Sequence, residues 1–101
     1  MKHTKVVFNS EKLHYSSELM RALAHPLRLK ILEFIDRHGE INVNKIYKTL
    51  NIEQSITSQH LRILRMAGVV DCIRDGKFMH YNINYEVIAR AQQAVKNFLG
   101  K

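Results

Sequence analysis

The stretch SITSQHLRILRMAG, residues 55–68, carries two helical periodicities at once. Its apolar residues recur with a period of 3.6 around Leu61 and Leu64, which predicts a helix that packs on a core and ends at Gly68. Polar residues recur with the same period on another side, at i, i+3, i+4 and i+7: Ser55, Ser58, Gln59 and Arg62. If this segment is a helix, one face is buried and the other is either merely solvated or kept for a ligand.

A second short helix is predicted directly before this stretch. In NVNKIYKTLN, residues 42–51, apolar residues recur at i, i+3, i+4 and i+7 from Val43, and Asn51 is suited to a helix end. Only the three residues NIE separate the two helices. Two short helices joined by a tight turn, the second with an outward polar stripe, predict a helix-turn-helix over about residues 43–67.

The segment after this pair predicts a hairpin. VVDCIRDGKFMHYNI, residues 69–83, holds two β-rich runs around Asp75 and Gly76, and Asp-Gly between such runs is a strong hairpin signal. A helix-turn-helix followed by a hairpin is a winged helix. The sequence therefore predicts a mainly α fold with a small β-hairpin wing, and Arg74 and Lys77 at the wing tip are candidate DNA contacts.

Three further helices complete the predicted order of helix, helix, helix, helix, strand, strand and helix in one winged helix-turn-helix domain over residues 1–101. The second helix follows from HPLRLKILEFIDRHG, residues 25–39, where Pro26 suits a first helical position and Gly39 lies past the end. The first and last helices are expected over about 10–24 and 85–99.

The first and last helices carry more apolar residues than a small winged-helix core requires. These residues are Leu13 and Met20 on the first helix and Ile88, Ala91, Val95 and Phe98 on the last. We expect these helices to pair two protomers, which would place two recognition helices on the two half-sites of a near-palindrome. The alternative is that both helices only complete the core of a monomer.

Composition points to an anionic partner. Lys and Arg number 16 against 9 Asp and Glu, a formal net charge of +7, which favours DNA, RNA or anionic lipid. The chain has neither an apolar run of about 18 residues nor the apolar core of a signal peptide, so we expect a cytoplasmic protein with no membrane partner. The single Cys72 cannot form an internal disulfide, in agreement with a reducing compartment.

Four segments together resemble the ArsR/SmtB family of bacterial winged-helix repressors: LAHPLRLKIL (23–32), SQHLRILRMAGVV (58–70), RDGKFMHYNI (74–83) and the final helix. The resemblance extends from about residue 17 to 98. It implies a homodimer built on the first and last helices, which binds double-stranded operator DNA and releases it when an inducer binds.

The same resemblance places the recognition positions on Gln54, Ser55, Ser58 and Gln59, whereas Arg62 follows from the periodicity alone. The sequence departs from the family at Glu53, where a Ser often caps the recognition helix. Glu is the poorer cap, so the start of the helix is defined only to within a residue or two.

The known metal sites of this family cannot be assembled from this sequence. One site uses Cys residues in the helix before the recognition helix, which has none here. Another pairs carboxylate and His side chains on the last helix, which offers Glu86 and no His. No two of the six His residues share an i, i+3 or i, i+4 spacing, and Cys72 suits strand packing better than redox sensing. We therefore predict no metal site and no cofactor, and the inducer is unassigned.

Two other classes of function compete with a repressor. A winged helix can be a protein-interaction module without specific DNA readout, but loss of the polar stripe or a net acidic charge would be expected there. An enzyme is not expected, because the chain has no Gly-rich phosphate loop, nucleophile elbow or HExxH motif. The sequence thus favours a sequence-specific transcriptional repressor.

Overall fold

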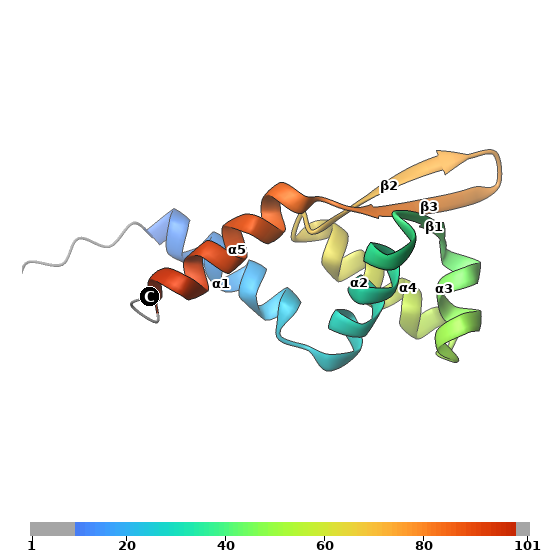
Figure 1. Ribbon diagram of the computed structural model, residues 1–101, viewed down its shortest axis with the longest axis horizontal. Coiled ribbons are helices and arrows are strands. Elements are labelled where there is room, and N and C mark those ends of the chain that lie inside the picture. Colours follow the sequence, from blue (N-terminus) through green and yellow to red (C-terminus); the bar gives the residue numbers. More distant parts are fainter. Residues whose placement is uncertain (1–9, 99–101) are drawn as a thin grey trace, which may run out of the picture.

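A computed structural model describes residues 10–98 of the chain, with side chains from residue 14 to 97. Five helices and three strands follow one another in this part (Figure 1). They are α1 (Ser10–Leu23), α2 (Pro26–His38), β1 (Glu40–Asn42), α3 (Val43–Leu50), α4 (Gln54–Met66), β2 (Val70–Asp75), β3 (Phe78–Ile83) and α5 (Tyr85–Phe98). The predicted helix-turn-helix is α3 and α4, and the predicted wing is β2 and β3. Residue 99, the predicted end of the last helix, lies outside the described residues.

The strands form one antiparallel sheet in the order β1-β3-β2, with one strand more than the sequence predicted. The added strand β1 consists of Glu40, Ile41 and Asn42, and Ile41 pairs with Tyr81 of β3. Only Ile41 of the three is buried. Three residues are too few to show the alternation of apolar and polar residues that marks a strand in a sequence. Its existence depends on β3 being there to pair with it.

Local turn residues end the elements where the sequence predicted. Asn51 adopts the left-handed conformation at φ 55°, and its backbone N–H bonds the carbonyl of Tyr47, which closes α3. At the wing tip Asp75 pairs with Phe78, so the hairpin loop is Gly76 and Lys77. Gly76 has φ 64°, the positive value that the first position of a two-residue hairpin loop requires.

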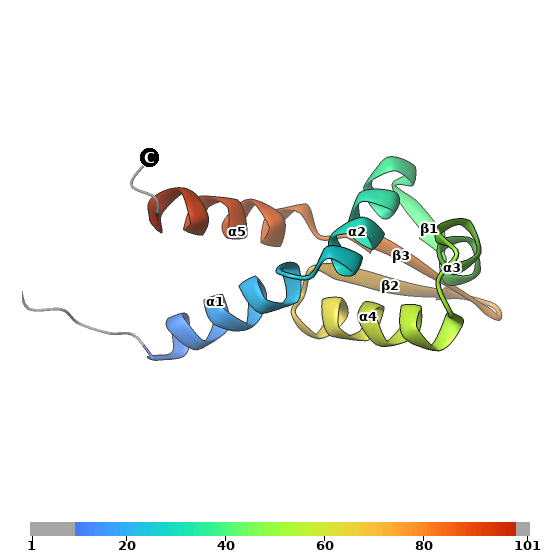
Figure 2. The same cartoon turned by 90° about the horizontal axis from the view of Figure 1, so that it is seen from below.

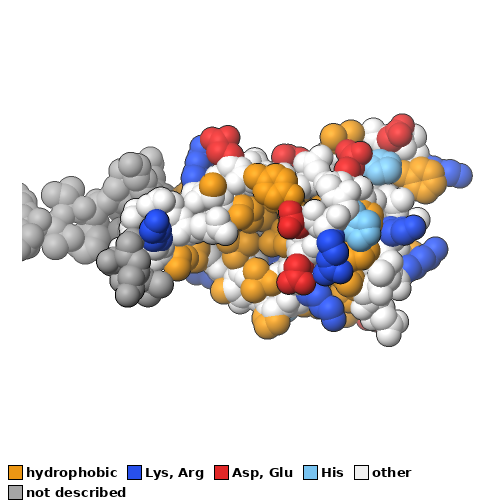
Figure 3. All heavy atoms as spheres, viewed as in Figure 1, with side chains coloured by type: hydrophobic (Ala, Val, Ile, Leu, Met, Phe, Trp, Pro, Cys, Tyr) orange, Lys and Arg blue, Asp and Glu red, His pale blue; other side chains and the backbone are white. Residues whose placement is uncertain are grey.

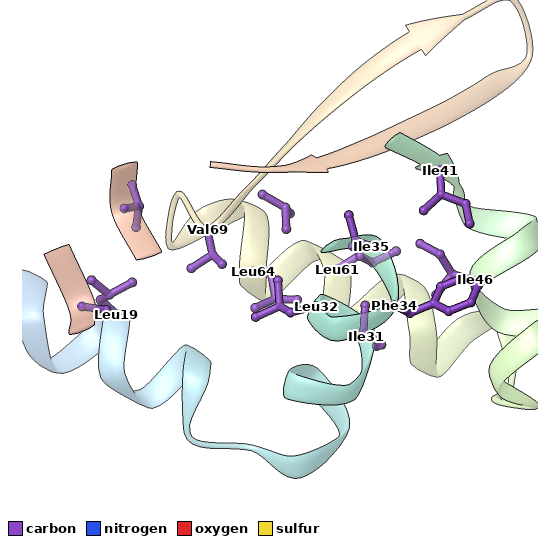
Figure 4. Close-up of a cluster of buried hydrophobic side chains, with 13 residues drawn as sticks. Leu19, Ile31, Leu32, Phe34, Ile35, Ile41, Ile46, Leu61, Leu64 and Val69 are labelled. Carbon is purple, nitrogen blue, oxygen red and sulfur yellow. The ribbon is translucent and has the colours of Figure 1, made fainter. Parts of the chain in front are cut away.

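The core lies between the three central helices and the sheet (Figure 4). Most apolar side chains with no exposed surface come from α2, α3 and α4: Ile31, Ile35, Ile46, Leu61 and Leu64. Val69, between α4 and β2, is also without exposed surface. Leu19 of α1 and Val87 and Ala91 of α5 extend the same cluster toward the terminal helices. The core therefore fixes α4 on its inner side and also attaches α1 and α5.

The elements divide the molecule into two ends. In both Figure 1 and Figure 2, α1 and α5 form one end, whereas α3, the wing tip and the N-terminus of α4 lie at the other. In the part of the chain that the structure describes, no helix is both long and apolar enough to cross a bilayer.

Candidate nucleic-acid interface

Helix α4 is fixed by one face and open on the other. Its buried residues Thr57, Leu61 and Leu64 point into the core. Figure 2 shows α4 along one edge of the molecule, with no other element beyond it. The three-residue connection from α3 predicted at 51–53 is present, so α3 supports the N-terminal end of α4. This is the arrangement that allows a helix to enter a DNA groove.

The residues of α4 predicted to contact DNA share its open face. Gln54, Ser55, Ser58, Gln59 and Arg62 are all exposed. A Gln side chain can bind adenine with two hydrogen bonds, an Arg can do the same with guanine, and a Ser hydroxyl can bond either a base edge or a phosphate. The face thus presents donors and acceptors suited to a major groove.

Helix α4 begins without a side-chain cap. Glu53 occupies the cap position, and its side chain accepts no hydrogen bond from the first turn, as its poor capping character predicted. The structure places the first helical residue at Gln54. The N–H groups of this turn lack the partner that a Ser or Asp would supply, and such groups favour phosphate.

Exposed cations lie at the same end of the molecule as the N-terminus of α4. Arg74 and Lys77 are exposed at the wing tip, where Arg74 Nε donates to the carbonyl of Gly76 over 3.3 Å. Lys45 and Lys48 on α3 are exposed as well, and sequence reasoning missed them although their i, i+3 spacing puts them on one side of that helix. Among the salt bridges of the described residues, none involves these four cations or Arg62. Several Lys and Arg side chains are visible toward this end in Figure 3.

His60 does not belong to the open polar face of α4. It is half-buried, on the side of α4 that faces the turn between α1 and α2, where Arg28 and His25 contact it. At this position His60 supports the helix from its inner edge.

Comparison with known proteins places the chain in a family. Residues 25–71 match the model of the bacterial regulatory proteins of the arsR family. The transcriptional repressor PagR of Bacillus anthracis is 39% identical, over 77% of this chain and 83% of that protein. The transcriptional repressor SdpR of Bacillus subtilis is 31% identical, over 84% and 93%. The chain belongs to the ArsR family.

The fold agrees with this assignment. A solution structure of a homodimeric winged helix-turn-helix DNA-binding domain from Mycobacterium bovis, described as a possible ArsR-family regulator, superposes with a TM-score of 0.76. It is 25% identical and covers 98% of this chain and 91% of its own. ArsR-family proteins are transcriptional regulators, so this chain is a DNA-binding regulator and not an enzyme.

The residues predicted for the ArsR-type dimer differ in their accessibility. Val95 is 39% exposed, and Met20 and Ile88 are half-buried at the edge of the core. Ala91 is only 3% exposed because it packs inside its own chain, beside the core residues of α1 and α5. The structure does not describe the side chains of Leu13 and Phe98.

Possible metal ligands are not grouped in the part of the chain that the structure describes. Among residues 10–98 no set of three or more His, Cys, Asp or Glu side chains could hold a metal ion.

Cys72 is half-buried on β2, directly opposite Tyr81 of β3. Burial raises the pKa of Tyr81, and a hydrogen bond between the Cys72 and Tyr81 side chains raises it further.

Proposed function

We propose that this ArsR-family regulator is a homodimeric repressor. Its two α4 helices enter successive major grooves of a near-palindromic operator, and an inducer releases the protein from DNA. The observation that carries the proposal is the open polar face of α4, from Gln54 to Arg62, with unpaired cations on α3 and the wing at the same end of the molecule. Because the proposed ligand is operator DNA, the proposed place of action is the cytoplasm.

Each candidate DNA contact has a distinct proposed role. Gln59 and Gln54 contact base edges in the major groove, with Ser55 and Ser58 bonding bases or phosphates beside them. Arg62 lies farther along α4 and meets the phosphate backbone. Arg74 and Lys77 reach the adjacent minor groove or its phosphates from the wing.

The dimer is proposed to form through α1 and α5. These helices lie together at the end of the molecule away from the wing (Figure 1). Tyr15 and Val95 expose 44% and 39% of their surface there, and large apolar side chains gain stability when a partner covers them. The homodimeric state of the related domain from Mycobacterium bovis supports the same assembly here. Leu13, Met20, Ile88 and Phe98 are the other proposed contacts.

The proposal is tested by selecting bound sequences from random duplex DNA, followed by titrations of single variants by fluorescence anisotropy. Gln59→Ala should cost about 1–3 kcal/mol on the best site and relax the preference at one position. Lys77→Ala should weaken binding to all duplexes alike and reduce the dependence on salt. Gln93→Ala, on α5 at the end away from the wing, is the matched control and should bind like the wild type.

The two possible failures differ in meaning. If selection yields no preferred sequence, the protein does not read DNA bases and is better described as an interaction module. If a site is found but Gln59→Ala loses affinity equally on that site and on random DNA, Gln59 contacts only the backbone.

A further inference from the structure

A buried polar cluster joins α1, α2 and α4 behind the DNA-facing surface. At its centre is Arg28, which is only 8% exposed. Its Nε donates to the carbonyl of Ala22 over 2.6 Å, and its Nη2 donates to the carbonyl of Arg21 over 3.0 Å. The guanidinium therefore holds the C-terminal turn of α1, where carbonyl groups lack partners and a cation is favourable.

The same guanidinium reaches the recognition helix. Its Nη1 lies 3.3 Å from Nδ1 of His60, on α4. Because a guanidinium has donors and no acceptor, this contact is a hydrogen bond only when His60 Nδ1 accepts, that is, when the ring is neutral with its hydrogen on Nε2. The rings of His60 and His25 lie beside each other, 4.8 Å between centroids. His25 in turn caps α2 by accepting the N–H of Leu27 at Nδ1.

We propose that neutral His60 is a positioning residue for operator binding: by accepting from Arg28 it holds α4 against α1 and α2 in the orientation that fits DNA, and a proton on its ring releases the helix. The affinity for operator DNA then falls at acid pH. This inference rests on the proposed function, since it concerns the orientation of the helix that reads the operator.

The groups around His60 all oppose its protonation. Burial, His25 and Arg28, in that order, lower the pKa of His60 from its ordinary value of 6.5. The α1 end contributes carbonyl groups that Arg28 already occupies, and the side chain of Arg21 is paired with Glu18. One turn away along α4, the neighbours of His60 in both directions are uncharged: Ile56, Thr57, Ile63 and Leu64.

The sign of the pH effect follows from this shift. Well above pH 6.5 the ring is neutral in both the folded and unfolded chain, and the contact with Arg28 contributes fully. As the pH falls from 6.5 toward the lower folded pKa, the unfolded or released state binds the proton more readily, so the stabilisation is lost. A proton on Nδ1 also replaces the hydrogen bond with two donors of like charge facing each other.

The direction of this effect separates it from general electrostatics. Protonating exposed histidines adds positive charge and should tighten binding to a polyanion. Release of α4 should weaken it. We expect wild-type affinity for the selected operator to fall by less than about tenfold between pH of about 7.5 and about 5.5 at constant ionic strength, because a tenfold fall would require His60 to keep its ordinary pKa of 6.5.

The decisive variant is His60→Asn, whose amide oxygen can take the place of Nδ1 as an acceptor but cannot titrate. It should bind the operator at neutral pH like the wild type and lose the acid sensitivity. His38→Gln is the matched control. His38 Nδ1 faces the carbonyl of Phe34 at 2.9 Å, so it donates already and protonation does not break that bond. This variant should keep the wild-type pH profile.

A measurement on the wild type alone covers the case in which His60→Asn does not fold. NMR titration of the assigned His60 ring should show the hydrogen on Nε2 and a protonation midpoint that coincides with the loss of DNA binding. A ring that stays neutral while binding falls, a flat pH profile, or equal acid sensitivity in His60→Asn would overturn the inference while leaving the proposed function intact. No operator binding at neutral pH would instead overturn the proposed function.

Discussion

Thr57 offers a test of how α4 packs, because its side chain is buried in an apolar core. The residue has no exposed surface, and its Oγ1 is a buried side-chain oxygen without a hydrogen-bond partner among the described residues. Burying an unpaired hydroxyl costs about 1–3 kcal/mol. Thr57→Val replaces the hydroxyl with a methyl group of similar size, and both residues are β-branched with similar helix propensity. We therefore expect the free energy of unfolding to rise by about 1–2 kcal/mol.

Urea denaturation at a fixed protein concentration measures this change, since the stability of a dimer depends on concentration. The midpoint should rise with an unchanged slope, and the melting temperature should rise by about 4–8 °C for each kcal/mol. Thr49→Val, at an exposed position on α3, is the matched control and should change stability by less than about 0.5 kcal/mol. Operator affinity should not change, because Thr57 is buried and does not belong to the exposed polar face of α4.

A loss of stability of about 1 kcal/mol in Thr57→Val would refute this reasoning. It would mean that the hydroxyl is bonded in the folded protein, most simply to the carbonyl of Glu53, which already accepts the N–H of Thr57 at 2.9 Å.

Three further predictions concern the start of α4, the dimer and the inducer. Glu53→Ser supplies the missing cap and should raise the free energy of unfolding by about 0.5–2 kcal/mol, which is measured as a higher melting temperature. Glu33→Ser, at an exposed position on α2, should not raise it. Val95→Asp places a carboxylate in the proposed interface, so light scattering should show monomers and fluorescence anisotropy should show weakened operator binding. A wild-type protein that is monomeric at micromolar concentration would contradict the dimer. Zinc, nickel or cobalt at a few equivalents per protomer should change operator affinity by no more than about threefold, which is less than ~1 kcal/mol of coupling free energy. A tenfold loss of affinity that a chelator reverses would instead reveal a metal site.

The sequence by itself determined the features that depend on neighbours along the chain. The periods of apolar and polar residues in SITSQHLRILRMAG predicted the burial of Leu61 and Leu64 and the position of the polar face. The structure exposes Ser55, Ser58, Gln59 and Arg62 as expected, whereas Ile56 and Ile63 beside the buried residues are exposed too. Asn51 and Gly76 marked a helix end and a hairpin because each supplies a positive φ that most other residues resist. Such signals are local, so they survive without knowledge of the tertiary structure.

Tertiary structure alone decided which residues at the margins of these patterns are buried. Thr57 lies between Ser55 and Ser58 in sequence, yet it has no exposed surface because the adjacent elements cover that side of α4. Ala91 belonged to an apolar stripe that could face a partner, and the packing of α1 against α5 places it inside the chain. Strand β1 is too short to be predicted from the sequence, and it forms because it pairs with β3.

The contact between Arg28 and His60 is the clearest case of information that the sequence does not hold. The two residues are 32 positions apart, and neither lies in a pattern that singles out the other. Their meeting depends on how α1, α2 and α4 cross, which the shared apolar core determines through side-chain packing over the whole molecule. A hydrogen bond between distant side chains requires both to be positioned to within a fraction of an ångström, and only the completed fold provides that positioning.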